Sequence, residues 1–402
     1  MSKTFVLAPD SFKESMTAKE VCIAMEAGIK KVYPDAEFIH VPMADGGEGT
    51  VQSLVDATGG TIYSADVTGP LGNTVTARYG VMGDQETAVI EMAEASGIHY
   101  VNKDTKNPLI ATTYGTGELI RACLDKGIKQ IIIGIGGSAT NDGGAGMAEA
   151  LGVQFLDKEG HPIPRGGGHL DQLHTIDLSK VDSRLKDVSV IVACDVNNPL
   201  CGETGASNVF GPQKGATPEM VKQLDQNLAH YADIVEQQLG LSVRHTPGAG
   251  AAGGLGAGLL TFTNATLQKG IDIVIEYSGL RDKLLNADYV FTGEGGMDFQ
   301  TQFGKTPYGV AQAAKELDKK VIAIAGCIGE GAEELYNKGI DAIFGIIPEL
   351  KPLDQTLKNG PKNIERTCES ISRVLKSLAQ EEEHKTEARR GRSPPAEAML
   401  MS

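Results

Sequence analysis

The chain has 402 residues, a formal net charge of −15 and 50 glycines, and only 5% of its residues are aromatic. This length excludes a single small module and predicts two domains or one large elaborated domain. The acidic balance argues against a nucleic-acid surface, and no apolar run reaches the roughly 20 residues of a membrane span. Because the N-terminus shows no signal-peptide pattern, we expect a cytoplasmic protein that binds neither nucleic acid nor membrane.

The N-terminal segment alternates strands with helices. The apolar run 5–8 predicts a strand, and a helix over 17–33 follows it. Thr17 and Glu20 form a capping-box pattern at the start of this helix, and Pro34 follows its apolar period. A second strand over 38–43 leads into a second helix, which two consecutive glycines end.

The pattern changes between residues 61 and 92, where short β-rich runs separated by turn residues are typical of antiparallel hairpins. Simple alternation of strands and helices returns clearly only after about residue 285. We therefore predict two α/β domains. Residues 1–66 and 286–379 form a flavodoxin-like or Rossmann-like domain with a parallel sheet, and residues 67–285 form an inserted mixed α/β domain. Residues 380–402 lack an apolar period and are predicted to be a disordered tail.

Six apolar runs end in polar loops, most of them rich in glycine. The loops are Pro9–Lys13, 44–49, 134–146, 194–195, 292–298 and 325–329. In open α/β sheets, ligands bind beside the carboxyl ends of the strands. Any one of these loops could be ordinary punctuation between a strand and a helix, but six together favour a binding site.

The most informative loop is Gly134-Ile135-Gly136-Gly137-Ser138-Ala139-Thr140-Asn141-Asp142-Gly143-Gly144. Glycines let backbone N–H groups approach an anion closely, and a helix that begins after the loop would point its positive end at that anion. We therefore predict that the cofactor-binding residues include Gly136, Gly137, Ser138, Thr140 and Asn141. Asn141 and Asp142 also offer oxygen ligands for the divalent cation that phosphates bring with them.

Two known nucleotide-binding motifs resemble segments of this sequence in part. The turn 134–139 satisfies the dinucleotide pattern G-x-G-x-x-A, and Asp157 lies about 20 residues further on, where such a motif places its ribose-binding acid. An NAD(P)-dependent dehydrogenase is therefore the alternative function. The segment Gly304-Lys305-Thr306 resembles the end of a Walker loop, but Phe299 stands where that motif needs glycine.

The chain carries more acidic loops and lysines than a hydride-transfer enzyme needs, and this inventory favours phosphoryl transfer. The predicted catalytic residues are Asp195, Asp298 and Lys13; the predicted cofactor-binding residues outside the glycine loop are Lys214, Gly293 and Lys305; the predicted metal ligands are Asp45, Glu48, Asp142 and Glu294. Asp195 is the first choice for general base, with Asp298 and Glu294 as competitors. An Asx turn would also explain Asp195, helix-dipole pairing would explain Asp45 and Glu48, and solvation would explain the lysines.

The loops together resemble the bacterial type 1 glycerate kinases over about residues 3–380. The matching segments are 8–15, 44–50, 136–144, 194–195, 198–200, 210–215 and 247–254. The resemblance implies phosphorylation of D-glycerate with ATP and Mg²⁺ in glycerate and glyoxylate metabolism, at the 2-position in preference to the 3-position. It also implies an active site in the cleft between two α/β domains, in a monomer or homodimer.

One loop departs from the pattern of this family. The family usually has arginine at the position of Gly296 and serine near Phe299, whereas the surrounding residues of the segment 292–307 match. If that arginine binds the substrate carboxylate or a phosphate, the chain is a catalytically impaired relative. The sequence leaves this alternative open.

Overall fold

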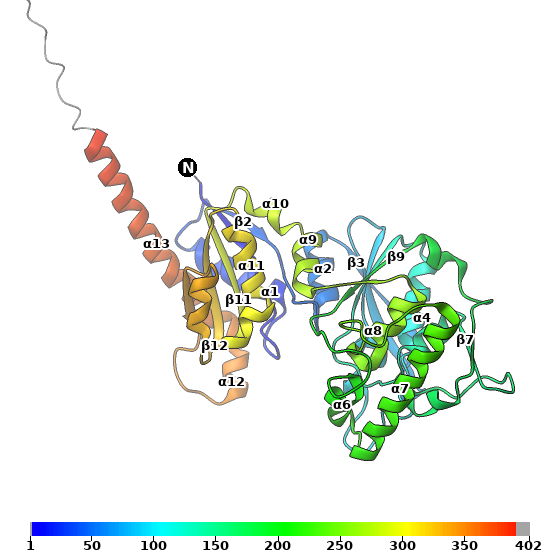
Figure 1. The fold of residues 1–402 in the computed structure, drawn as a ribbon. Coiled ribbons are helices and arrows are strands. Elements are labelled where there is room, and N and C mark those ends of the chain that lie inside the picture. Colours follow the sequence, from blue (N-terminus) through cyan, green and yellow to red (C-terminus); the bar gives the residue numbers. More distant parts are fainter. Residues whose placement is uncertain (1, 391–402) are drawn as a thin grey trace, which may run out of the picture.

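The computed structural model describes residues 2–390, and these contain two large sheets (Figure 1). The first sheet has five parallel strands in the order β13-β12-β11-β1-β2. Its strands are β1 (Thr4–Leu7), β2 (Glu37–His40), β11 (Tyr289–Met297), β12 (Lys320–Ile328) and β13 (Ala342–Gly345). The two ends of the chain therefore meet in one sheet, as the sequence pattern predicts.

The second sheet has six strands in the order β10-β9-β6-β5-β4-β3. They are β3 (Thr61–Thr68), β4 (Thr74–Val81), β5 (Thr87–Glu91), β6 (Gln130–Gly134), β9 (Ser189–Ala193) and β10 (Thr266–Gln268). Strands β3, β4 and β5 are antiparallel neighbours, and the pairs from β5 to β10 are parallel. The predicted α/β fold, with one parallel and one mixed sheet, is confirmed.

The predicted domain bounds stay a prediction. Strand β3 crosses the predicted boundary at residue 66, and it pairs with β4 along its whole length within the second sheet. A further small antiparallel pair, β7 (Gln154–Leu156) with β8 (Thr175–Asp177), belongs to neither large sheet.

Helix α1 (Ala18–Lys30) begins with the predicted capping box: Thr17 accepts from the Glu20 N–H, and the Glu20 carboxylate accepts from the Thr17 N–H at 2.8 Å. Helix α13 (Gly360–Arg390) packs against α1, and a Cβ on Gly28 would lie only 2.1 Å from the carbonyl oxygen of Glu365. Helix α13 continues past residue 379, where the predicted tail begins. Residues 391–402 of that tail lie outside the described residues.

Further helices cover the sheets. They are α2 (Thr50–Thr58), α3 (Ala93–Ser96), α4 (Tyr114–Asp125), α5 (Ala145–Ala150), α6 (Ala206–Phe210), α7 (Pro218–Leu239), α8 (Ala251–Phe262), α9 (Gly270–Tyr277), α10 (Leu280–Leu284), α11 (Thr306–Lys315) and α12 (Leu353–Lys358). Short 3₁₀ helices occur as well, and those used below are η4 (Pro212–Lys214) and η5 (Phe299–Phe303). Across residues 2–390, no helix is both long and apolar enough to cross a membrane.

Helices α2 and α9 join the two sheets in one apolar core. This core includes Val6 and Val290 from the first sheet, Ile132 from the second, and Leu54 and Ile271 from the two helices. All five side chains are almost completely buried. Figure 1 shows α2 and α9 between the two halves of the molecule. Burial of this shared apolar surface fixes how the carboxyl ends of the two sheets face each other.

Candidate active site

The first sheet reverses its strand order at β1. The chain adds β2 on one side of β1 and later adds β11 on the other. Such a reversal opens a crevice at the carboxyl ends of the strands. Asp10 follows β1 and Glu294 lies near the end of β11, and the Asp10 N–H donates to the Gly293 carbonyl at 2.8 Å. The loops that carry these two carboxylates therefore lie side by side at the crevice.

The carboxylate of Asp10 is held in a fixed position and is short of positive charge. It accepts a hydrogen bond from the Thr306 hydroxyl at 2.6 Å and from the Ser11 N–H at 2.6 Å. Burial raises the pKa of Asp10 to about 6, and the negative charge of Asp45 adds to this effect. A neighbouring cation would lower this pKa again.

Glu294 has a similar environment on the opposite side of the crevice. Its carboxylate accepts from the Thr301 hydroxyl at 2.9 Å and lies 3.7 Å from the Lys305 ammonium. Burial raises the pKa of Glu294 to about 7 despite Lys305, and the charges of Asp10 and Asp45 contribute to the rise. The predicted residues Glu294, Gly293 and Lys305 are thus brought together. Asp10, which sequence reasoning left out of the site, belongs with them.

The loop that carries Asp45 connects the two sheets. Gly46 has φ +93°, and a Cβ there would lie 2.4 Å from Cα of Gly270 and 3.1 Å from Cβ of Ala193. A Cβ on Gly134 would lie 2.9 Å from the Gly46 carbonyl oxygen. The loop after β2 is therefore seated on the carboxyl ends of β6 and β9, and it brings Asp45 to the junction of the two sheets.

Glu91 anchors the same loop. It ends β5, and its carboxylate accepts from the Gly49 N–H at 3.1 Å and from the Val51 N–H at 2.9 Å. These amides belong to the start of α2, where a negative charge is stabilising. Because it acts through the loop, Glu91 is a positioning residue that sequence reasoning missed. Its place at the end of a strand was the available signal.

Asp195 follows β9 and faces this junction from the second sheet. Its carboxylate accepts from the Gly270 N–H at 3.0 Å, the first amide of α9. The Asp195 side chain is exposed to solvent. Its carboxylate is nevertheless partly desolvated by the surrounding protein, which raises the pKa of Asp195, and the charge of Asp45 adds to that rise. Asp45 therefore interacts electrostatically with carboxylates of both sheets, since it also raises the pKa of Asp10 and of Glu294.

Only part of the glycine loop after β6 is exposed to solvent. Gly136 and Gly137 are exposed, Gly137 has φ +71°, and Ser138 follows with 7% of its surface exposed. Thr140 and Asn141 are completely buried, and the Asn141 amide donates to the Ser207 hydroxyl at 2.9 Å. Of the predicted phosphate-binding residues, Gly136, Gly137 and Ser138 can meet a ligand, whereas Thr140 and Asn141 face the interior.

The Asp142 carboxylate takes its hydrogen bonds from the protein interior and not from the ligand side of the loop. It is completely buried, and its carboxylate accepts from the Thr113 N–H at 2.8 Å, the Thr113 hydroxyl at 2.9 Å and the Gly144 N–H at 3.1 Å. The Gly146 N–H donates to it as well, at 3.3 Å. The backbone N–H groups at the start of the short helix α5 thus donate to Asp142. The sequence pattern predicts that these N–H groups bind the anion of a ligand.

Lys214 is the other buried charge of this loop. Only 2% of its surface is exposed, and its ammonium donates to the Ser138 hydroxyl at 2.7 Å and to the Thr140 carbonyl at 2.6 Å. Burial lowers the pKa of Lys214 to about 7. The predicted phosphate-binding lysine therefore lies behind the loop and not on its open side.

The remaining predicted residues lie at the margins. Lys13 and Glu48 are exposed, and a Cβ on Gly295 would lie 3.6 Å from the Lys13 backbone nitrogen. Asp298 accepts from the Gln300 N–H at 2.8 Å and so caps the 3₁₀ helix η5. This bond explains Asp298 as a structural cap. None of the hydrogen bonds of Asp298 joins its carboxylate to Asp10, Asp45 or Glu294, and its catalytic role stays a prediction.

Within residues 2–381, no three His, Cys, Asp or Glu side chains converge closely enough to hold a metal by themselves. This arrangement suits Mg²⁺, which usually keeps several waters and binds through one or two carboxylates together with substrate phosphates. Asp10, Asp45 and Glu294 offer the hard oxygen ligands that Mg²⁺ requires, and burial and mutual repulsion leave them in need of a cation. The donor set therefore fits a cation that arrives with a nucleotide.

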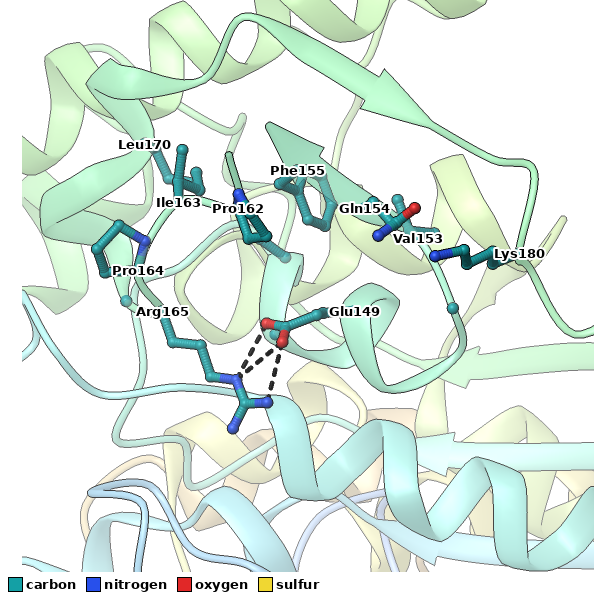
Figure 2. Close-up of a pocket in the computed structure, with 14 residues that line it drawn as sticks. Glu149, Val153, Gln154, Phe155, Pro162, Ile163, Pro164, Arg165, Leu170 and Lys180 are labelled. Atoms are coloured by element: carbon teal, nitrogen blue, oxygen red, sulfur yellow. Dashed lines mark hydrogen bonds and ion pairs between the residues drawn. The ribbon is translucent and has the colours of Figure 1, made fainter. Parts of the chain in front are cut away.

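A cavity of about 250 Å³ lies elsewhere, between α5 and the segment 152–166. Figure 2 shows Phe155, Ile163 and Leu170 in its walls and the ion pair of Arg165 with Glu149 along one side, at 2.9 Å. None of the predicted site residues lines this cavity.

The dinucleotide alternative is not supported. Asp157 follows β7, which pairs with β8 and not with the sheet that contains β6. Its carboxylate accepts from the N–H groups of Glu159 and His161, each at 2.9 Å, and thereby closes a turn. A ribose-binding acid needs a neighbouring parallel strand in the same sheet, and the strand–helix–strand unit of that motif does not form here.

Comparisons with known proteins agree with this geometry. The model of the glycerate kinase family matches residues 5–376. A glycerate kinase of Haemophilus influenzae is 55% identical over 92% of this chain and 98% of its own length, and the glycerate 2-kinase of Escherichia coli K12 is 49% identical over 92% and 97%. A solved structure of a glycerate kinase 2 from Salmonella typhimurium LT2 matches with a TM-score of 0.88 and 49% identity, covering 94% of this chain and all of that one. The chain therefore belongs to the glycerate kinase family and is a kinase.

Proposed function

We propose that this kinase transfers the γ-phosphoryl group of ATP, bound with Mg²⁺, to the 2-hydroxyl of D-glycerate. One observation carries the proposal: the loop of Asp45 is seated on the carboxyl ends of β6 and β9, so that it joins the carboxylates of one sheet to the glycine loop of the other. A relative that is 49% identical bears the name glycerate 2-kinase, which supports the 2-position.

The roles of the residues follow from their places. One or two of the carboxylates of Asp10, Asp45 and Glu294, together with the nucleotide phosphates, would hold Mg²⁺, which neutralises phosphate charge when it is bound. Gly136, Gly137 and Ser138 form the exposed part of the glycine loop and would contact phosphate oxygens through backbone N–H groups and a hydroxyl. Lys305, at the start of α11, would place a further positive charge near the same phosphates.

Asp195 is the proposed proton acceptor for the glycerate hydroxyl. It lies across Asp45 from the other carboxylates, it is exposed toward solvent, and its pKa is raised above the ordinary value by burial of the carboxylate and by Asp45. A general base works best with a pKa near the operating pH, and removal of one typically costs 10²- to 10⁴-fold in rate. A cytoplasmic location and a monomeric or homodimeric state stay predictions.

The test is ADP release by the purified full chain with MgATP and D-glycerate, with a parallel reaction that contains enolase. We expect ADP release that depends on D-glycerate and a product that enolase consumes directly, because enolase acts on 2-phosphoglycerate. A product consumed only after a mutase is added would assign the 3-position. Equal ADP release with and without glycerate would contradict the proposal.

The matched variant is Asp195→Asn, which keeps the size of the side chain and a carbonyl oxygen for the Gly270 N–H. We expect turnover to fall at least ~10²-fold while the KM for MgATP stays unchanged. Turnover close to that of the parent would remove Asp195 from the chemistry and leave Glu294 and Asp298, the competitors that the sequence offers, as candidate bases.

A further inference from the structure

A short, closely packed segment holds Lys214 behind the glycine loop. Helix α6 ends at Phe210, and the turn η4 then carries Lys214 to Gly215, which has φ +93°. The Lys214 N–H donates to the Gly211 carbonyl at 3.0 Å. The same segment meets the loop a second time, where the Asn141 amide donates to the Ser207 hydroxyl. The backbone of this segment therefore determines where the ammonium lies.

The hydrogen bonds of Lys214 determine whether the Ser138 hydroxyl donates or accepts toward it. A charged lysine ammonium can only donate, so at 2.7 Å the Ser138 oxygen acts as an acceptor toward it. The O–H of Ser138 is then not used on the inner side of the loop. Ser138 directly follows the exposed residues Gly136 and Gly137. Its hydroxyl hydrogen is thus available for an acceptor on the outer, ligand side of the loop.

Direct contact between Lys214 and a nucleotide is not compatible with this arrangement. The side chain is 2% exposed, and two of its donors already serve Ser138 and the Thr140 carbonyl on the inside. The charged ammonium donates both bonds, whereas the neutral amine, which the pKa of about 7 makes accessible, has a lone pair that can accept from Ser138 instead. Ser138 is therefore held as an acceptor toward Lys214 when Lys214 is charged, and nearby phosphate charge favours this state.

We propose that Lys214 is a positioning residue for the phosphate chain of the nucleotide: it forces Ser138 to donate its hydroxyl hydrogen to a phosphate oxygen, and it touches no part of the nucleotide itself. This inference rests on the proposed function, because it requires that phosphates lie at the outer face of the loop. It changes the role of Lys214 from a ligand of the nucleotide to a support for one.

The test compares Lys214→Met, Ser138→Ala and the double variant. A hydrogen bond to a charged phosphate that persists from ground state to transition state affects binding and leaves turnover unchanged. We therefore expect each single variant to raise the KM for MgATP by roughly 10- to 100-fold with little change in kcat or in the KM for D-glycerate. The double variant should be no worse than the poorer single one, because both changes remove the same bond.

Lys106 provides the matched control. It is a partly exposed lysine whose ammonium donates to the Gln213 carbonyl at 3.1 Å, one residue before Lys214. Lys106→Met removes a similar side chain that contacts the same turn and should leave all kinetic constants unchanged. A similar loss in both lysine variants would show that the turn, and not the Ser138 contact, matters.

Several results would overturn the proposal. Independent, multiplicative losses in the double variant would mean that Lys214 binds the nucleotide itself, and an unchanged KM for MgATP in Ser138→Ala would exclude the hydroxyl contact. The second result holds even if Lys214→Met does not fold, which circular dichroism reveals. If the parent protein releases no ADP with glycerate, the proposed function fails separately, and calorimetric titration of the same variants with MgATP still decides the role of Lys214.

Discussion

Gly46 offers a direct test of how the two sheets are joined. A Cβ at this position would lie 2.4 Å from Cα of Gly270, and ordinary contact begins at 3.4 Å. In Gly46→Ala the loop or the start of α9 must therefore move by about 1.0 Å, the difference between these distances. The backbone conformation, φ +93°, is itself unfavourable for alanine.

The size of the effect follows from these two terms. A left-handed backbone costs an alanine about 1–2 kcal/mol, and overpacking in a closely packed site costs typically about 1–3 kcal/mol more. Because Asp45 precedes Gly46, a shift of this size also displaces its carboxylate. A misplacement of about 1 Å can lower catalysis by about 10²-fold. We expect both a loss of stability and a loss of kcat/KM.

Gly49→Ala is the matched control, because Gly49 lies in the same loop with φ +92° and a Cβ added there would have no atom within 4 Å. The Gly49→Ala variant has the same unfavourable backbone conformation but no close contact for the added Cβ. Urea unfolding should show Gly46→Ala less stable than Gly49→Ala by about 1–3 kcal/mol. Steady-state kinetics should show a loss of kcat/KM only in Gly46→Ala. Equal behaviour of the two variants would refute the contact between this loop and α9.

Three further predictions concern the second sheet and the departure in β11. Asp142→Asn should destabilise the fold by about 2–4 kcal/mol in urea unfolding, because an NH₂ group replaces one oxygen that now accepts hydrogen bonds from backbone N–H groups. A stable variant with an altered Mg²⁺ requirement would instead show that Asp142 binds metal. Gly296→Arg should change the free energy of unfolding by less than about 0.5 kcal/mol, since Gly296 is exposed and open space surrounds its Cβ position. The parent protein should release ADP without this arginine. A parent protein that is inactive until arginine is introduced would identify an impaired relative. The pKa of Lys214 falls from the ordinary 10.5 to about 7 on folding, so between these pH values the unfolded chain binds more protons and stability rises with pH, by at most about 1.4 kcal/mol per pH unit. Lys214→Met should lose that rise in thermal unfolding across pH 7 to 10, and an equal slope in both proteins would show that Lys214 does not titrate as described.

The sequence predicts much of the fold, because the relevant signals are local. The capping box of Thr17 and Glu20, the stop at Gly59, and the hairpin pattern between 61 and 92 each depend on a few neighbouring residues, and each is confirmed. All six apolar runs that end in polar loops are strands with parallel neighbours. The polar loops therefore lie at the carboxyl ends of sheet strands, as the sequence pattern predicts.

What the sequence leaves open depends on contacts between distant segments. The pattern of Asn141 and Asp142 is the same whether their polar atoms face a ligand or the interior, and only packing against Ser207, Thr113 and the start of α5 decides it. Lys214 has the residue type of a phosphate ligand, yet it is enclosed behind the loop. The seating of the Asp45 loop on the second sheet is likewise a long-range contact, and no local pattern reports it.

The most direct measurement of the central claim is turnover of Asp45→Asn with MgATP and D-glycerate. Asparagine keeps the size of the side chain and an oxygen for the Gly47 N–H, which donates to Asp45 at 3.1 Å, but it removes the charge that acts on Asp10, Glu294 and Asp195. We expect a folded protein whose kcat/KM falls at least ~10²-fold and whose apparent affinity for Mg²⁺ weakens. A folded variant with turnover and Mg²⁺ dependence close to those of the parent would contradict an active site centred on Asp45.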